Sequence, residues 1–581
     1  MGKIKSLSIL VTALFIGLNG CSEQKKSKLN QTISIVPESK DRHSLTTVYI
    51  NADIITVNDT QPSAQAIAVR DGLIVAIGNR AKVEANAGSH TVIRDLQGQT
   101  LLPGFIDAHG HLSYTNQLFV SSNLSSPPVG TATNIEDIIT LLKKHRLKYP
   151  EASWLTGWGY DDSLLQEQRH PTREDLDKIS TDIPILLVHV SGHLVTCNSR
   201  CLELAEINAS TKNPAGGVIR RINGSNEPNG VLEEKAAMIA QLKLPRLSQS
   251  QQLELLDSTQ QYYASYGVTT LQDGAASANE LKLFKAASEQ SLLYLDVVAF
   301  PYAPIIGSKL DQYPPSASYN AHFRIGGIKL VLDGSPQGKT AWLTQPYYHP
   351  PQGQNSDYLG YPILTKEQLA TFYDYAFSNN VQLIAHANGD AAADQMINAV
   401  RIANQKYGKS DRRSVMIHAQ TVREDQIDSM LQEGILPSYF SVHTFYWGDW
   451  HRDSVLGKHR ASRISPLRST TNKGLTYTIH NDTPIVPPDM MRLLWSSVNR
   501  ETRSGKVLGH DQKATVLEGI KAMTINAAFQ YFEEDSKGSL EVGKIADLVI
   551  LNKNPLKVDK ANIKDITVLE TIKNGQTVFK L

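Results

Sequence analysis

An apolar run that ends in two histidines constrains this chain more than any other feature of its sequence. The run covers residues 101–106, and His109 and His111 follow it. Residues i and i+2 of a strand point to the same side, so the two imidazoles are expected at one point. Two neutral imidazoles on one side make half of a metal site. The alternative is a pair of ordinary histidines at the end of a strand.

The composition is that of a folded, nearly neutral protein. Of the 581 residues, 41% are hydrophobic and 20% are charged, and 58 Lys and Arg stand against 57 Asp and Glu. This balance provides no basic surface for nucleic acid. Beyond the N-terminus, no apolar stretch approaches the ~20 residues of a membrane span. The length indicates two or three structural units.

The N-terminus has the pattern of a targeting segment. Two lysines precede a mostly apolar stretch over residues 7–18, and Cys21 closes the segment after a glycine. The pattern resembles a bacterial lipoprotein signal, which implies cleavage of residues 1–20 and lipidation of Cys21. Ser22 favours the outer membrane, with the protein facing the periplasm. A plain secretory signal is the alternative and also exports the chain. Residues 21–45 are polar and read as a flexible tether.

The other two cysteines, Cys197 and Cys201, lie four residues apart. In an oxidising compartment they are able to pair, but this spacing equally suits one face of a helix. We expect two unpaired thiols. No second Cys/His pair lies near them, so they do not make a zinc knuckle.

The two ends of the chain are rich in short β-type runs. Residues 46–100 contain several, with an Asp71-Gly72 turn signal, and residues 546–579 contain more, with an Asn574-Gly575 turn signal. We expect the two ends to meet in one small β domain. Between them, helical stretches such as 366–379 alternate with short apolar runs, which predicts a parallel α/β architecture. Residues 157–234 are rich in Gly, Asn and Pro and are expected to form an irregular insertion.

Several apolar runs carry or end in a residue suited to metal or proton chemistry. If the runs are strands of one barrel, their carboxyl ends converge on the face that carries the chemistry. Taken singly, each residue has a structural alternative: a hydrogen-bonded core histidine, a lysine that reaches the surface, or an aspartate that caps a helix. Their succession favours a common site. The residues are Lys329, His386, His418, His480 and Asp482.

These segments together resemble the amidohydrolase superfamily, and specifically its amidohydrolase-3 branch, which includes N-substituted formamide deformylase-like proteins. The resemblance covers nearly everything from about residue 46 to 581. It implies a distorted (β/α)8 TIM-type barrel over 102–532, with an insertion at about 150–240. It also implies a small β-sandwich built from both termini, 46–101 and 533–581. The segments that carry it are 102–111, 192–199, 267–270, 329–335, 386–390, 418–420, 482–485 and 538–548.

The resemblance also implies a role for each site residue. A divalent metal is expected, with one or two ions per chain. A site of mixed imidazole and oxygen ligands favours zinc. Asp482 would take a proton from the attacking water and pass it to the leaving amine. Lys329 matches a lysine that is often carboxylated to bridge two metals. His193 would polarise the scissile carbonyl, or make a structural hydrogen bond. The metal ligands implied are His109, His111, Lys329, His386, His418 and Asp482, and the substrate contacts are His443 and His480.

The sequence therefore predicts an exported, lipid-anchored, metal-dependent hydrolase of a non-peptide C–N bond in an amide, N-formyl amide or cyclic amide. Its expected partner is a small-molecule substrate, and it contacts the membrane through the lipid anchor only. The sequence does not decide whether the chain forms a homodimer. One alternative is a deaminase or a mononuclear hydrolase with unmodified Lys329. Another is a non-enzymatic binding or regulatory lipoprotein on the same fold.

Overall fold

The computed structural model describes residues 45–581 except 89, 246 and 352. The predicted signal peptide, Cys21 and nearly all of the predicted tether lie outside the described residues. In the described part, no helix has the length and apolar character needed to cross a membrane.

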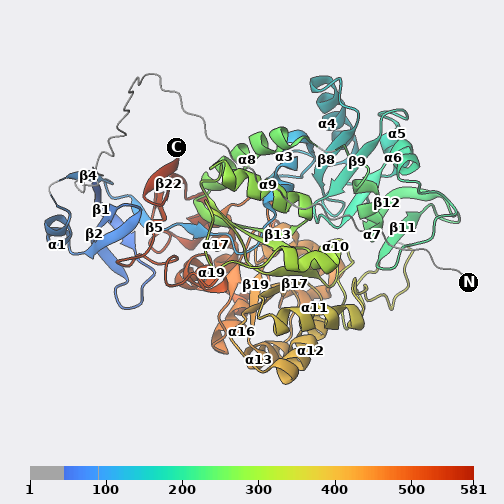
Figure 1. Cartoon of the computed structure of the whole chain (residues 1–581). Coiled ribbons are helices and arrows are strands. Elements are labelled where there is room, and N and C mark those ends of the chain that lie inside the picture. Colours follow the sequence, from blue (N-terminus) through green and yellow to red (C-terminus); the bar gives the residue numbers. More distant parts are fainter. Residues whose placement is uncertain (1–44, 89, 246, 352) are drawn as a thin grey trace, which may run out of the picture. The chain divides into compact units, whose positions relative to one another are not determined.

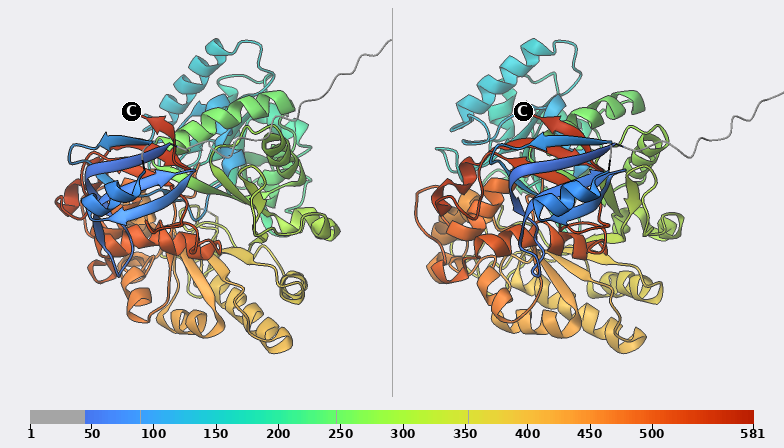
Figure 2. Two further views of the ribbon diagram at one scale, coloured as in Figure 1. Left: turned by 60° about the vertical axis from the view of Figure 1, so that its left-hand side comes forward. Right: turned by 90° about the vertical axis from the view of Figure 1, so that its left-hand side faces the viewer.

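The two ends of the chain share one sheet. Its strand order is β23-β22-β21-β5-β1-β2-β3, and β4 pairs with β1. The antiparallel pair β5·β21 joins the N-terminal strands to the C-terminal ones. Figures 1 and 2 show the N-terminal strands in blue beside the C-terminal strands in red. The strands are β1 (Thr46–Ile55), β2 (Ser63–Arg70), β3 (Leu73–Gly78), β4 (Thr91–Asp95), β5 (Thr100–Pro103), β21 (Leu548–Leu551), β22 (Val568–Lys573) and β23 (Gln576–Lys580).

Local sequence explains this sheet well. Asp71-Gly72 and Asn574-Gly575 both have positive φ at both positions, as the tight turn of a two-residue hairpin requires. Each turn joins neighbouring antiparallel strands, β2·β3 and β22·β23. Apolar residues of β1 fall alternately into two separate core clusters, so both faces of the sheet are covered. The two ends of the chain therefore meet in one sheet.

The centre of the chain forms the barrel strands in two parallel arcs. One arc runs β6-β13-β14-β15 and the other β16-β17-β18-β19-β20. Tyr302 and Lys329 form a parallel bridge between the arcs, and at the other junction the amide of Asp482 donates to the carbonyl of His109 at 3.1 Å. The strands are β6 (Phe105–Ile106), β13 (Val268–Ala276), β14 (Asp296–Pro301), β15 (Phe323–Ile325), β16 (Ile328–Val331), β17 (Leu383–Ala387), β18 (Ser414–His418), β19 (Ile435–Tyr439) and β20 (Thr478–Ile479).

Helices alternate with these strands, as the sequence pattern predicts for a (β/α)8 fold. The helix expected over 366–379 runs from Lys366 to Ser378, begins with a capping box at Thr365, and buries Leu369, Tyr373 and Phe377. The principal helices are α8 (Gln249–Ala264), α9 (Ala278–Glu289), α11 (Lys366–Ser378), α12 (Asp390–Tyr407), α13 (Glu424–Glu433), α14 (His443–Trp450), α16 (Leu467–Asn472), α17 (Met490–Asn499), α18 (Val516–Ala522) and α19 (Ile525–Gln530).

The insertion is not irregular, so that expectation was wrong. It forms a six-stranded sheet in the order β11-β12-β10-β9-β8-β7. Short apolar runs between Gly, Asn and Pro turns are enough to build it, because each strand pairs with at least one neighbour in the sheet. The strands are β7 (Ser122–Asn123), β8 (Leu155–Tyr160), β9 (Ile185–His189), β10 (Leu194–Cys197), β11 (Gly217–Arg221) and β12 (Pro228–Glu234), and the helices are α4 (Ile135–Lys148), α5 (Arg173–Asp177), α6 (Ser199–Leu204) and α7 (Lys235–Gln241).

The expectation of two unpaired thiols was also wrong. Cys197 and Cys201 form a disulfide with a Cα–Cα distance of 5.3 Å. Cys197 ends β10, whereas Cys201 lies in the first turn of α6, which Asn198 caps. The chain therefore turns from strand to helix between the two cysteines, and this turn brings their side chains together.

Candidate active site

The six predicted ligand residues lie in barrel strands or just after their carboxyl ends. His109 and His111 follow β6, Lys329 lies in β16, His386 in β17, His418 ends β18, and Asp482 follows β20. Two of these residues also have a strained backbone. His418 and Asp482 have φ of 72° and 56°, values that non-glycine residues rarely adopt and that tend to occur at functional sites. The prediction that these distant positions gather is consistent with the contacts that follow.

The first group of side chains surrounds the Asp482 carboxylate. Asp482 Oδ1 lies 3.2 Å from His111 Nε2 and 3.4 Å from His109 Nε2. These three residues have one ligand atom each within 4.8 Å of one another, as a metal ion needs. Lys329 Nζ lies 3.2 Å from His109 Nε2 and so belongs to the same group.

Gln272 of β13 fixes the tautomer of His109. Its side-chain amide donates to the carbonyl of Ala108 and to the hydroxyl of Tyr531, so its Oε1 is left to accept a proton. His109 Nδ1 lies 2.5 Å from that oxygen and therefore carries the hydrogen. His109 Nε2 is left with its lone pair directed toward the Asp482 group. Metal-bound histidines are usually oriented in this way by their other nitrogen.

The second group consists of His386 and His418. His386 Nε2 lies 3.1 Å from the carbonyl oxygen of Gly334 and 3.0 Å from the side-chain nitrogen of Asn388. His386 Nδ1 faces His418 Nε2 at 3.0 Å. His418 Nε2 is 3.9 Å from Asp482 Oδ2. Asp482 therefore links the two groups.

Burial sets the electrostatics of the cluster. It lowers the pKa of Lys329 to about 7, although the Asp482 charge opposes this shift, and much of the amine is therefore neutral near neutral pH. Burial also holds the pKa of His109, His386 and His418 well below the ordinary range. The histidines are therefore neutral, which is the form that binds metal.

His193 and Glu234 form a pair at the edge of the cluster. The His193 ring lies 4.9 Å from the His386 ring, and its Nδ1 is 2.8 Å from Glu234 Oε2. Burial opposes protonation of His193, but the Glu234 charge outweighs it and raises the pKa of the imidazole. Glu234 has φ of 50°, so strained backbone again coincides with the site.

His480 and His443 lie further from the Asp482 carboxylate. His480 Nε2 is 3.2 Å from His418 Nδ1, and its Nδ1 is 2.8 Å from Ser438 Oγ. His443 bonds His451 through Nδ1 at 2.9 Å. The ring of Phe440 stacks on His480 and packs edge-on against His443. Both histidines are buried, and His480 contacts the predicted ligand His418, while substrate contact by either residue stays a prediction.

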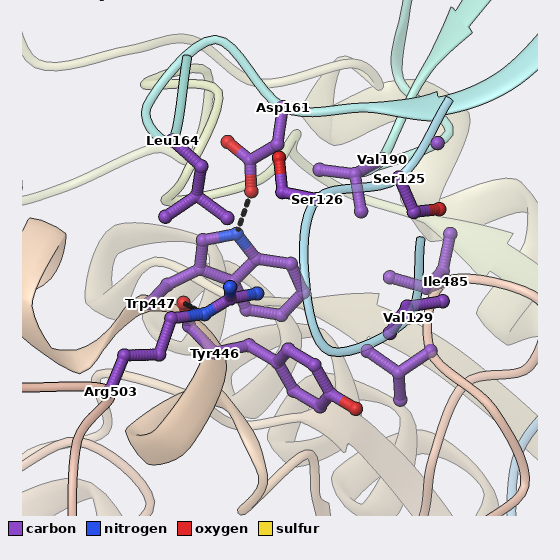
Figure 3. Close-up of a pocket in the computed structure, with 12 residues that line it drawn as sticks. Ser125, Ser126, Val129, Asp161, Leu164, Val190, Tyr446, Trp447, Ile485 and Arg503 are labelled. Carbon is purple, nitrogen blue, oxygen red and sulfur yellow. Dashed lines mark hydrogen bonds between the residues drawn. The ribbon is translucent and has the colours of Figure 1, made fainter. Parts of the chain in front are cut away.

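Figure 3 shows a small pocket with Asp161, Trp447 and Arg503 in its lining. Three segments that carry site residues also line it: Val190 precedes His193, Trp447 follows His443 by one helical turn, and Ile485 follows Asp482. Trp447 Nε1 donates to Asp161 Oδ2 at 2.7 Å, and this hydrogen bond holds the indole ring in place as one wall of the pocket. The remaining lining includes Ser125, Ser126, Val129, Gly159, Leu164, Tyr446 and Val486.

Three residues that orient the cluster were not identified from the sequence: Gln272, Glu234 and Ser438. Gln272 and Ser438 are polar residues inside otherwise apolar strands, which is a signal that sequence reading can use. Glu234 carries no such signal, because its contact with His193 depends on the pairing of β10 with β12.

The donors fit a divalent metal. Asp482 Oδ1 and His111 Nδ1 are buried without a hydrogen-bond partner among the described residues, a costly state for polar atoms. Gln272 orients the His109 imidazole, and this imidazole forms a donor set that suits zinc together with the His111 imidazole, the Asp482 carboxylate and the Lys329 amine.

Comparison with known proteins identifies the family of this chain. The amidohydrolase family model matches residues 92–579. The N-substituted formamide deformylase of Arthrobacter pascens is 27% identical over 90% of this chain and 97% of its own length. The Arabidopsis thaliana protein LONG AFTER FAR-RED 3 is 26% identical over 91% of each chain. The fold is shared with a Pyrococcus horikoshii metal-dependent hydrolase of uncharacterised function, at a TM-score of 0.70, 23% identity, and coverage of 89% of this chain and 99% of that one. The chain therefore belongs to the amidohydrolase family, in its amidohydrolase-3 branch.

Proposed function

We propose that this amidohydrolase cleaves the C–N bond of an N-formyl, N-acyl or cyclic amide at the Asp482 cluster. The observation that carries the proposal is the position of Asp482 Oδ1, which is buried between two histidines without a hydrogen-bond partner. The similarity to an N-substituted formamide deformylase supports an amide carbon as the point of attack.

We propose zinc as the metal, with one ion held by His109, His111 and Asp482 and a second by His386 and His418. Lys329 would bridge them as a carbamate, since carbon dioxide adds to a neutral amine and burial lowers the pKa of Lys329 to about 7. When bound, a divalent metal makes hydroxide available near neutral pH and polarises the scissile carbonyl.

The chain's own side chains handle the proton. The Asp482 carboxylate accepts it from the attacking water and later delivers it to the leaving nitrogen, since an amide anion is a poor leaving group. His193, whose pKa Glu234 raises, donates a hydrogen bond to the carbonyl oxygen as negative charge develops there. The walls formed by Trp447, Tyr446 and Ile485 hold an apolar substituent of the substrate.

A substrate screen tests this function. We expect the zinc-loaded chain to hydrolyse at least one class among N-formyl, N-acyl and cyclic amides, and Asp482→Asn to abolish that turnover. Release of ammonia from an aminated ring instead would favour the deaminase alternative. Metal binding with no turnover of any of these compounds would contradict the proposal and favour a binding or regulatory protein.

The state of Lys329 is tested separately. Isotopically labelled bicarbonate should give a carbamate signal in the spectrum of the wild-type chain, together with two zinc ions at the Asp482 cluster. Lys329→Ala should lose that signal and part of the bound zinc, and a short carboxylic acid supplied as a substitute ligand should restore zinc binding but not the signal. One zinc and no carbamate signal would instead support a mononuclear site.

We also propose that Cys21 is lipidated and holds the protein on the outer membrane, facing the periplasm. The apolar stretch over residues 7–18, followed by Gly20 and Cys21, supports this proposal. Cys21→Ser should move the protein from the membrane fraction to the periplasmic fraction. Retention of the variant in the membrane fraction would contradict lipid anchoring.

A further inference from the structure

A second cluster of histidine and carboxylate side chains lies in the insertion, away from the Asp482 group. Asp162 follows β8, His189 ends β9, and His170 lies in the loop before α5. The strands β8 and β9 are parallel neighbours, with Tyr160 opposite His189, so the strand register itself brings Asp162 and His189 together.

The two imidazoles converge on the carboxylate of Asp162. His189 Nε2 lies 2.9 Å from Asp162 Oδ1, and His170 Nε2 lies 3.4 Å from Asp162 Oδ2. Each residue offers one ligand atom, and all three atoms lie within 4.8 Å of one another. Around a tetrahedral zinc ion with bonds of about 2.0–2.1 Å, neighbouring ligand atoms lie roughly 3.3 Å apart. The cluster therefore already has nearly the spacing that a bound ion imposes.

Outer partners hold both imidazoles by their other nitrogen. His170 Nδ1 lies 3.2 Å from the Tyr160 hydroxyl, which itself bonds Thr196 Oγ1 at 2.9 Å. His189 Nδ1 lies 2.8 Å from Ser191 Oγ. Both oxygens are able to accept from an Nδ1–H group. In that tautomer both Nε2 lone pairs face Asp162, which is the arrangement of metal-binding histidines.

The opposite tautomer of His189 is the structural alternative. The Ser191 amide lies 3.2 Å from His189 Nδ1 and would donate to it if Nε2 carried the hydrogen. His189 would then donate to Asp162, and the three residues would form only a hydrogen-bonded chain. The contact through Ser191 Oγ is the shorter of the two.

The surrounding charges leave the carboxylate of Asp162 free for a cation. Its ion pairs within the described chain are the two with His170 and His189. The nearby cation Arg220 is bound by Glu233, with Nε 2.5 Å from Oε1. Lys339 points to Ser454 Oγ at 2.8 Å.

We infer that Asp162, His170 and His189 bind a divalent cation of the zinc type, distinct from the metal of the active site. The fourth position would be taken by water. The ion would join the carboxyl ends of β8 and β9. Asp161 and Val190 are the immediate neighbours of these ligands in sequence, and both line the pocket of Figure 3. The role of the site is therefore structural: it holds two walls of the pocket in place.

Zinc content per chain tests this inference. The full chain is equilibrated with zinc, freed of excess ion and measured by elemental analysis. We expect His170→Gln and His189→Gln each to bind one zinc ion fewer than the wild type, and His109→Ala to lose metal independently, so that the losses add in the double variant. His322→Gln is the matched control, because His322 pairs with Asp296 at 2.6 Å but has no second histidine there.

Unchanged zinc content in both variants, or an equal loss in His322→Gln, would overturn the inference. If the variants fold poorly, crystals of the wild-type chain grown with zinc decide the matter. Anomalous scattering at the zinc edge between His170 and His189 would support the site, and its absence there would refute it. The result is independent of the proposed function, since activity is not the readout.

Discussion

The Nε2 atom of His480 lies 3.2 Å from the Nδ1 atom of His418. His480 in turn bonds Ser438 Oγ at 2.8 Å through Nδ1. If His418 binds metal by Nε2, its Nδ1–H group donates to His480, and His480 donates to Ser438. His480 is then a positioning residue that orients a ligand.

Replacement of His480 tests this relationship. We expect His480→Phe to weaken zinc binding by about 10–100-fold, as loss of a partner to a metal-bound histidine does. Competition with a chelator of known affinity measures the change. Ser438→Ala should also weaken zinc binding, but by a smaller factor. His459→Phe, at an exposed position, should leave zinc binding unchanged. Wild-type affinity in His480→Phe would show that the ring only packs.

Asp482→Asn separates proton transfer from metal binding. The amide keeps one oxygen for the metal but no longer accepts a proton, so we expect zinc to remain and turnover to fall by about 10²–10⁴-fold. Zinc content and rate are measured on the same preparation. Asp394→Asn, at a surface carboxylate paired with Arg423, is the control and should behave as the wild type. Nearly normal turnover in Asp482→Asn would refute its role as proton carrier.

His109→Ala tests the metal assignment directly. Its Nε2 faces both Asp482 and Lys329, so its loss should lower the occupancy of the active-site metal. Elemental analysis after dialysis against limiting zinc gives the occupancy, with His510→Ala as an exposed control. Full occupancy in His109→Ala would exclude this histidine as a ligand.

The sequence indicates these ligands because each ends an apolar run that becomes a barrel strand. His386 and His418 can be identified as candidates from the local sequence alone, without any distant contact. The same is true of the two hairpins at Asp71-Gly72 and Asn574-Gly575, whose turn chemistry is local.

Other parts depend on pairings that sequence spacing does not contain. Glu234 reaches His193 only because β12 pairs with β10, and Cys197 reaches Cys201 only because the chain turns from strand to helix between them. The insertion sheet was missed for the same reason, since its strands are short and β8 pairs with β9 across a long connection.

The pair of His193 and Glu234 predicts a pH dependence. Glu234 raises the pKa of His193, so the protonated donor persists to a higher pH than in a free imidazole and is lost as pH rises through the raised pKa. We expect kcat/KM to fall on that alkaline side. Glu234→Gln should move the fall to lower pH, and His193→Gln should abolish it along with most activity. A profile that is identical in wild type and Glu234→Gln would contradict the role of the pair.

The last prediction concerns stability, through the contact that ties β4 to β22. Arg94 binds Glu570 with two parallel bonds, Nη1–Oε1 of 2.9 Å and Nη2–Oε2 of 2.6 Å, and Glu570 is buried. Arg94→Gln leaves this carboxylate without its charged partner, so we expect a loss of about 1–3 kcal/mol in the free energy of unfolding. Arg80→Gln, whose partner Glu84 is on the surface, should change it by less than about 0.5 kcal/mol.

The acid dependence of stability provides the second readout for this pair. Burial opposes ionisation of Glu570, but the hydrogen bonds from Arg94 outweigh it and lower the pKa below its ordinary 4.5. Because the folded-state pKa is the lower one, the stabilisation is present above pH 4.5 and is lost as pH falls through the folded-state value. Thermal unfolding across this range should therefore show that the wild type loses stability more steeply with falling pH than Arg94→Gln does. Parallel curves would mean that Arg94 stabilises the sheet by packing on Tyr49 and not by its charge.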